Sequence, residues 1–163
     1  LEGWHRVSLD AELIAMRPGM ALTLNGIAQG YVADRVASLL AAEGLTDILI
    51  DTGEIRALGG RPDGEGWRVQ LAAGGEVSLS SRALATSAPL GTTFDQGANV
   101  GHILDPVTGL PARSHWREIT VSAASAALAD ALSTASCLFQ TRTEIEAFLT
   151  AFADATLEAA TEI

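Results

Sequence analysis

Apolar residues recur at helical spacing between residues 27 and 40, and this pattern predicts the clearest helix of the chain. Asn25 is the candidate N-cap of this helix, and Gly44 is its candidate C-terminal stop. The apolar stretch at residues 20–24 predicts a short strand just before the helix. The stripe itself consists of Ile27, Tyr31, Val32, Val36, Leu39 and Leu40.

Most other apolar positions fall in short runs separated by turn-forming residues, which is typical of strands and hairpins. The predicted strands are residues 47–51, 54–60, 67–71, 76–80, 83–87 and 118–123, and the further predicted helices are residues 125–139 and 143–152. The first two strands meet at a corner formed by Thr52 and Gly53. This order of elements favours an α+β fold, with a mixed, largely antiparallel sheet packed by a few helices.

The segment GHILDPVTG, residues 101–109, predicts a short strand that runs into a tight turn at Asp105 and Pro106. His102 heads that strand. Adjacent side chains of a strand face opposite sides, so His102 faces away from the core if Ile103 is buried. Two interpretations stay open from these residues alone: a structural histidine that caps the core, or a histidine that faces a site.

The helix at residues 125–139 has an ordinary apolar stripe, but its opposite face also lacks the charges that water contact favours. Asp130 is the only charged residue from Ile119 to Phe139. We therefore expect both faces of this helix to be covered, with small residues allowing close approach. A carboxylate in such surroundings is costly unless it is paired.

Asp130 and Thr134 are four residues apart and share one helix face, so their oxygens could bind a divalent cation together. The alternative is an ion pair between Asp130 and an arginine, with the Thr134 hydroxyl bonded back to the Asp130 carbonyl. A second candidate site is the helix start with Gly26 and Gly30, whose free N–H groups would suit a phosphate. That signal is weak, because many helix starts contain glycine.

Composition limits the classes of partner. The 163 residues suffice for one domain, and the formal net charge of −10 argues against nucleic-acid binding through a general positive field. A single cysteine excludes an internal disulfide, and no apolar stretch approaches the length of a membrane span. Patterns typical of a P-loop, a dinucleotide fold, a zinc site or a nucleophile elbow are not found in the sequence.

Five segments, taken in order, resemble the FAD:protein FMN transferase family, the ApbE-like proteins. They are LTLNGIAQGYVADRV, ILIDTGEIRALG, ALATS, GHILDPVTGLP and ADALSTA, spread over roughly residues 20–139. Each motif alone is modest, and their shared order and spacing make the resemblance specific. It implies an enzyme that uses Mg²⁺ and FAD, moves FMN to a Thr or Ser hydroxyl of a target protein, and releases AMP.

The resemblance also assigns roles to residues. Asp130 and Thr134 would bind the metal together with a backbone carbonyl of Gly26 or Ala28, and His102 would accept the proton of the incoming hydroxyl. The residues implied to contact FAD are Asn25, Gly26, Gln29, Gly53, Glu54, Thr86, Ser87, His102 and Ile103. A cation fits the chemistry, because a pyrophosphate and an acidic protein both carry negative charge.

Three positions depart from the family pattern: Gln29 replaces a usual Lys, Asn25 often replaces Gly, and Glu54 stands where Asp or Asn is commoner. The family's N-terminal portion has no counterpart, so we expect residues 1–163 to form a single domain, the C-terminal part of a longer flavin transferase. The family implies a periplasmic, membrane-anchored location. Two rival functions share the same pocket: a non-catalytic FAD-binding or accessory domain, and a Mg²⁺-dependent FAD pyrophosphatase.

Overall fold

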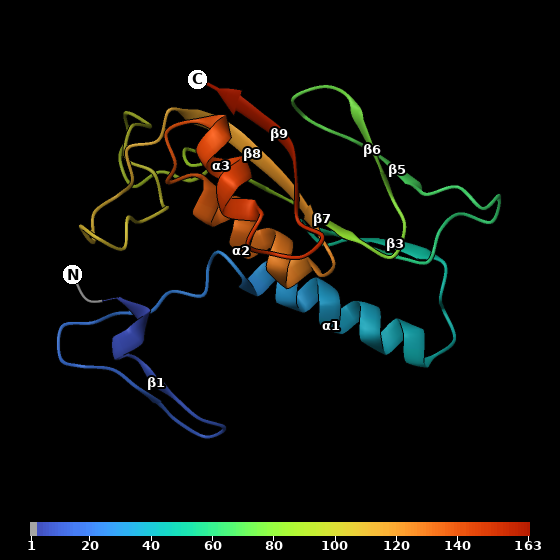
Figure 1. Ribbon diagram of the computed structural model, residues 1–163, viewed down its shortest axis with the longest axis horizontal. Helices are drawn as coiled ribbons and strands as arrows, with labels where there is room; N and C mark the ends of the chain where they lie inside the picture. Colours follow the sequence, from blue (N-terminus) through green and yellow to red (C-terminus); the bar gives the residue numbers. More distant parts are fainter. Residues whose placement is uncertain (1–2) are drawn as a thin grey trace.

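A five-stranded antiparallel sheet forms the centre of the protein, whose computed structural model describes residues 3–163 (Figure 1). Its strand order is β3-β4-β7-β8-β9. The bounds are β3 (Ile48–Asp51), β4 (Ile55–Leu58), β7 (Ala83–Ser87), β8 (Trp116–Ala123) and β9 (Thr156–Glu162). With the helices described next, this sheet confirms the predicted α+β class.

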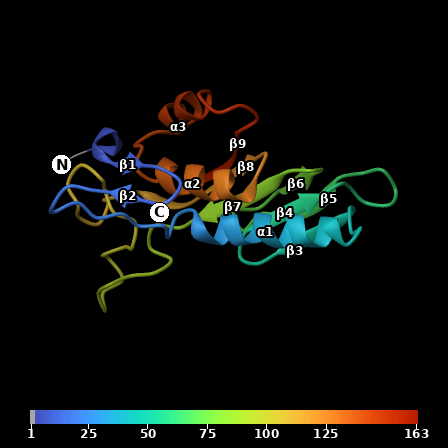
Figure 2. The same cartoon turned by 90° about the horizontal axis from the view of Figure 1, so that it is seen from below.

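Three α-helices accompany the sheet: α1 (Ala28–Ala42), α2 (Ala126–Ser136) and α3 (Arg142–Leu149). Helices α1 and α2 pack against each other and against the sheet (Figures 1 and 2). Small side chains make this contact so close: Ala33, Ala83, Ala85, Ala123, Ala126 and Ala129 are all buried there. The predicted coverage of the polar face of α2 is confirmed, and α1 provides part of the cover.

Strand β7 shows how the alternation of side chains separates two packing layers. Ala83 and Ala85 face the two helices, whereas Leu84 joins a second apolar cluster with Val69 and Leu79. Those two residues belong to the hairpin of β5 (Trp67–Gln70) and β6 (Glu76–Leu79), which lies where the sequence predicts it. A third cluster packs α2 and α3 onto β8.

The end of α1 matches its prediction, and the start does not. Gly44 has φ +87°, its N–H donates to the Ala41 carbonyl at 3.0 Å, and the Leu45 N–H donates to the Leu40 carbonyl at 3.0 Å. This pair of bonds is the helix-ending motif that favours glycine. The predicted N-cap is wrong, because Asn25 begins a turn and the cap position falls on Ile27, which makes no side-chain capping bond.

Two predicted strands are absent from the described residues. Residues 20–24 form no strand, and residues 21–24 are exposed. Their apolar pattern therefore does not reflect pairing within a sheet. Residues 101–104 make only isolated bridges, Thr93 with Gly101 and Leu104 with Pro111. The first partner lies in the preceding loop at residues 92–100 and the second just after the turn that begins at Asp105, so the segment is an irregular connection.

Strand β9 is one element that the sequence does not predict. Its residues are rich in Ala and Glu, which are uncommon in strands. Pairing with β8 along almost its whole length overrides that preference. Strands β1 (Ser8–Leu9) and β2 (Ile14–Ala15) form a small hairpin that was also not predicted. No helix among the described residues has the length and apolar character needed to cross a membrane.

Candidate functional site

Asp130 lies on the polar face of α2, with only 4 % of its surface exposed. Its Oδ2 accepts a hydrogen bond from the Gly30 backbone N–H at 3.1 Å. A Cβ on Gly30 would overlap the Ala126 carbonyl, so only glycine lets α1 come this close to α2. The prediction of a free Gly30 amide for phosphate is therefore wrong, because Asp130 already occupies that donor.

Asp130 forms no ion pair within residues 3–163, so the alternative of a structural arginine partner does not apply. Arg56 pairs instead with Asp34, at 3.2 Å between Nε and Oδ1. Asp34 also accepts the Ala126 and Ala127 N–H groups, each at 2.9 Å, and so caps α2. Burial raises the pKa of Asp130, and the Gly30 amide partly opposes that rise.

A cluster of hydroxyl groups lies one turn further along α2. The Ser87 Oγ is 2.7 Å from the Ser133 Oγ and 3.0 Å from the Thr134 Oγ1. Gly26 packs against the same threonine, since a Cβ there would lie 2.9 Å from the Thr134 Oγ1. The back-bond to the Asp130 carbonyl comes from Ser133 at 3.0 Å, rather than from Thr134 as the alternative had it.

Glu54 is a second buried carboxylate, at the corner between β3 and β4 and 6 % exposed. Its Oε2 has no hydrogen-bond partner among the described residues. Burial raises the pKa of Glu54 to about 8, the charges of Asp130 and, less strongly, Asp51 add to the rise, and the Thr86 amide opposes it. Because Asp130 affects the ionisation of Glu54, the two carboxyl groups share one electrostatic environment.

The neighbouring residues implied to contact FAD are partly gathered here. A Cβ on Gly53 would lie 3.4 Å from the Gln29 Nε2, which brings the β3–β4 corner against the first turn of α1. The Thr86 hydroxyl instead bonds the Thr120 hydroxyl at 2.9 Å. Asn25 is exposed, and its N–H donates to the Thr23 Oγ1 at 3.2 Å. Ala28, the other candidate carbonyl for the metal, begins α1.

His102 lies on the irregular loop, half-buried, and is held by one residue. Its Nδ1 is 3.1 Å from the Thr92 carbonyl oxygen, and its backbone N–H donates to the same oxygen at 3.1 Å. A carbonyl oxygen only accepts, so Nδ1 carries the proton and neutral His102 keeps a lone pair on Nε2. Ile103 is buried in the core as expected, 7 % exposed. The resemblance implies that His102 belongs to the same site as Asp130, and this stays a prediction.

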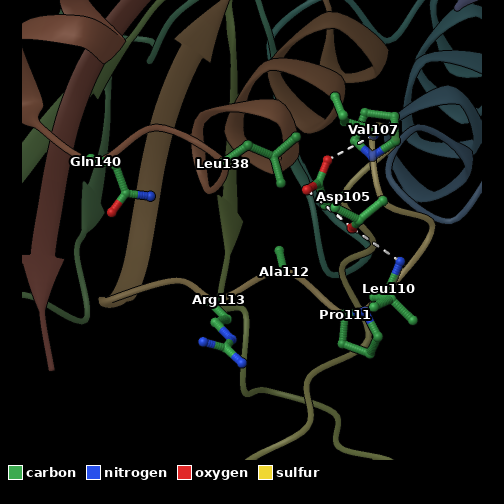
Figure 3. A pocket seen from close by; sticks show the side chains of 10 residues that line it. Asp105, Val107, Leu110, Pro111, Ala112, Arg113, Leu138 and Gln140 are labelled. Carbon is green, nitrogen blue, oxygen red and sulfur yellow. Dashed lines mark hydrogen bonds between the residues drawn. The ribbon is translucent and has the colours of Figure 1, made fainter. Parts of the chain in front are cut away.

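A cavity of about 510 Å³ lies beside the same loop, between residues 105–113 and the end of α2 (Figure 3). Asp105 organises its rim, because its carboxylate accepts the Val107 N–H at 2.8 Å and the Thr108 hydroxyl at 3.1 Å. This confirms the turn predicted at Asp105. Leu138 and Gln140 form the opposite wall, and none of the lining residues described belongs to the set implied for FAD or the metal.

The structure thus brings Gly26 and Ser87 into contact with Thr134, and it places Glu54 within the electrostatic influence of Asp130. The described residues contain no cluster of three or more His, Cys, Asp or Glu side chains, so any cation here also depends on hydroxyl and carbonyl oxygens. Sequence reasoning missed Ser133, although a hydroxyl directly before Thr134 on a buried helix face was a usable signal.

Comparison with known proteins agrees with the motifs. The ApbE family profile matches residues 1–158. The FAD:protein FMN transferase of Haemophilus influenzae is 30% identical over 148 residues, which cover 81% of this chain and 43% of that protein. The Chlamydia trachomatis transferase of the same name is 32% identical, covering 87% of this chain and 48% of its own length. The chain therefore spans less than half the length of these relatives.

Solved structures show the same fold. The apo form of the flavinyl transferase ApbE from Pseudomonas stutzeri superposes with a TM-score of 0.74 at 32% identity, covering 90% of this chain and 48% of that one. The ApbE protein of Thermotoga maritima gives a TM-score of 0.80 at 28% identity, covering 98% of this chain and 57% of that one. On the profile match and these relatives, the chain belongs to the ApbE family.

Proposed function

We propose that this chain carries the cation-bearing part of a flavin transferase, which moves FMN from FAD to a Thr or Ser hydroxyl of a target protein and releases AMP. The observation that carries the proposal is Asp130, a buried carboxylate without a cationic partner among the described residues, with the Thr134 hydroxyl one turn further on. Relatives that bear the name FAD:protein FMN transferase support the reaction class.

The donor set fits Mg²⁺, which binds carboxylate, hydroxyl and carbonyl oxygens. Asp130 and Thr134 would hold the ion together with a backbone carbonyl of Gly26 or Ala28. The close contact of Gly26 with Thr134 supports the choice of that segment. A bound cation would neutralise the pyrophosphate of FAD and stabilise the charge that develops on the departing AMP.

His102 would serve as the proton acceptor. The acceptor hydroxyl oxygen forms a bond to the phosphorus of the FMN half, the bond from that phosphorus to the AMP oxygen breaks, and the hydroxyl proton passes to His102. Supporting this role, the Thr92 carbonyl keeps the proton on Nδ1, so Nε2 is the free basic atom. The same carbonyl fixes the orientation of the ring.

Binding of the anionic substrate would depend on local groups, because the chain as a whole has a net charge of −10. Gln29 offers an amide where the family usually has a Lys, and it lies against Gly53. This substitution leaves the cation as the main positive charge beside the pyrophosphate. We therefore expect the reaction to depend strictly on the divalent ion.

The test incubates the protein with FAD and Mg²⁺, with and without an acceptor peptide, and analyses peptide mass and nucleotides. AMP together with a flavin-bearing peptide supports the transferase. AMP with free FMN in both reactions indicates a pyrophosphatase, and FAD binding without AMP indicates a binding domain. Asp130→Asn should abolish AMP release, whereas Glu43→Gln, at the exposed end of α1, is the matched control.

A further inference from the structure

Glu54 is a buried carboxylic acid, and few neighbouring groups offset the cost of burying it. It follows the turn after β3, is 6 % exposed, and leaves its Oε2 without a hydrogen-bond partner among the described residues. The nearest arginine in sequence, Arg56, is engaged with Asp34. A buried polar group without a partner is costly, and a buried charge costs more. The position therefore calls for a compensating group.

The pairing of the sheet strands places Glu54 beside the part of β7 that contacts the helix of Asp130. Strand β4 pairs with β7 in the register Ile55 opposite Leu84, which sets Glu54 beside the end of β7 where Thr86 and Ser87 lie. Ser87 in turn contacts Thr134 on α2 at 3.0 Å between the hydroxyl oxygens. Glu54, directly before β4, and Asp130, on α2, thus lie on two segments that both pack against β7.

Two carboxylates in one buried region repel each other, and burial disfavours the charge of both. Glu54 is only 6 % exposed and Asp130 only 4 % exposed, so water does little to screen either charge. A divalent cation removes the repulsion and supplies a partner for the orphaned oxygen. A proton held between the two carboxyl groups is the competing explanation, and it would need no metal.

We propose that Glu54 provides a second carboxylate for the divalent cation held by Asp130 and Thr134. The inference rests on the cation site of the proposed function and adds to it a ligand from the β3–β4 corner. Hard cations such as Mg²⁺ and Mn²⁺ prefer oxygen donors, and two carboxylates balance the ion's charge within the buried site. The β3–β4 corner would then be fixed to α2 through the ion.

The test measures Mn²⁺ binding to the protein alone, without FAD, from the electron paramagnetic resonance signal of the free ion. Glu54→Gln and Asp130→Asn should each weaken Mn²⁺ binding by roughly 10-fold or more, on the scale of changes around metal ligands. Glu54→Asp should bind Mn²⁺ better than Glu54→Gln. Glu43→Gln should match the wild type, and circular dichroism checks that each variant is folded.

The outcomes separate the two proposals. Weak binding by Asp130→Asn with normal binding by Glu54→Gln overturns the role of Glu54 and leaves the Asp130 site intact. Normal binding by both variants, or no binding by the wild type, overturns the cation site itself. If Glu54→Gln does not fold, wild-type crystals soaked in Mn²⁺ decide: a Glu54 oxygen about 2.0–2.4 Å from the ion supports the inference, and a longer separation overturns it.

Discussion

Replacing Gly30 with alanine tests the close packing of α1 on α2. In an ordinary helix interior this change stabilises a protein by about 0.5–1 kcal/mol, because alanine has the higher helix propensity. Here the new Cβ would collide with the Ala126 carbonyl, a rigid backbone group. Helix α1 would have to move away from α2, and the Gly30 N–H would lose its bond to the Asp130 carboxylate.

The expected magnitude follows from these two losses. Overpacking costs about 1–3 kcal/mol and a hydrogen bond to a charged group about 1.5–3 kcal/mol, so the net loss after the propensity gain is about 2–5 kcal/mol. Urea unfolding followed by far-UV circular dichroism measures it. Ala41→Gly, at an exposed position of α1, is the control and should lose only about 0.5–1 kcal/mol. A Gly30→Ala protein as stable as the wild type would refute the reasoning.

Three further predictions concern catalysis, substrate binding and pH. His102→Ala should lower the rate of FMN transfer by roughly 10²–10⁴-fold with little change in FAD affinity, and a normal rate would return His102 to a structural role. Flavin fluorescence should show FAD binding weaker than micromolar, because residues 1–163 span less than half the length of the relatives named FAD:protein FMN transferase; sub-micromolar binding would show that these residues suffice for the pocket. In the capping box of α3, the Thr141 hydroxyl and amide lower the pKa of Glu144, so this box stabilises the fold above about pH 4.5 and loses its effect as pH falls further. Glu144→Gln should remove that part of the acid sensitivity in urea unfolding. An unchanged pH profile would contradict this prediction.

The sequence predicts best where local chemistry decides the structure. Gly44 ends α1, and Asp105 organises its turn, because both effects depend on neighbours only a few residues away. Strand β9 could not be predicted in this way, since its alanines and glutamates become a strand only by pairing with β8. The strand expected at residues 101–104 does not form, because within residues 3–163 this segment pairs only through isolated bridges with Thr93 and Pro111.

In the candidate site, too, some features could be predicted from the sequence and others could not. The lone charge of α2 and the hydroxyl one turn away were visible in the sequence, and so was the need for cover on that face. The partners of those groups were not visible, because Gly30 lies 100 residues from Asp130 and Ser87 lies 47 residues from Thr134. Glu54 gives no sequence signal of its burial, which arises from the pairing of β4 with β7.

The proposed function depends most directly on a divalent cation at Asp130 and Thr134, and a crystal structure of the protein with Mn²⁺ tests this. We expect an anomalous-scattering peak with the Asp130 carboxylate and the Thr134 Oγ1 each about 2.0–2.4 Å from the ion, and a backbone carbonyl of Gly26 or Ala28 completing the set. A fully occupied Mn²⁺ elsewhere, with Asp130 still bound only to the Gly30 amide, would contradict the account.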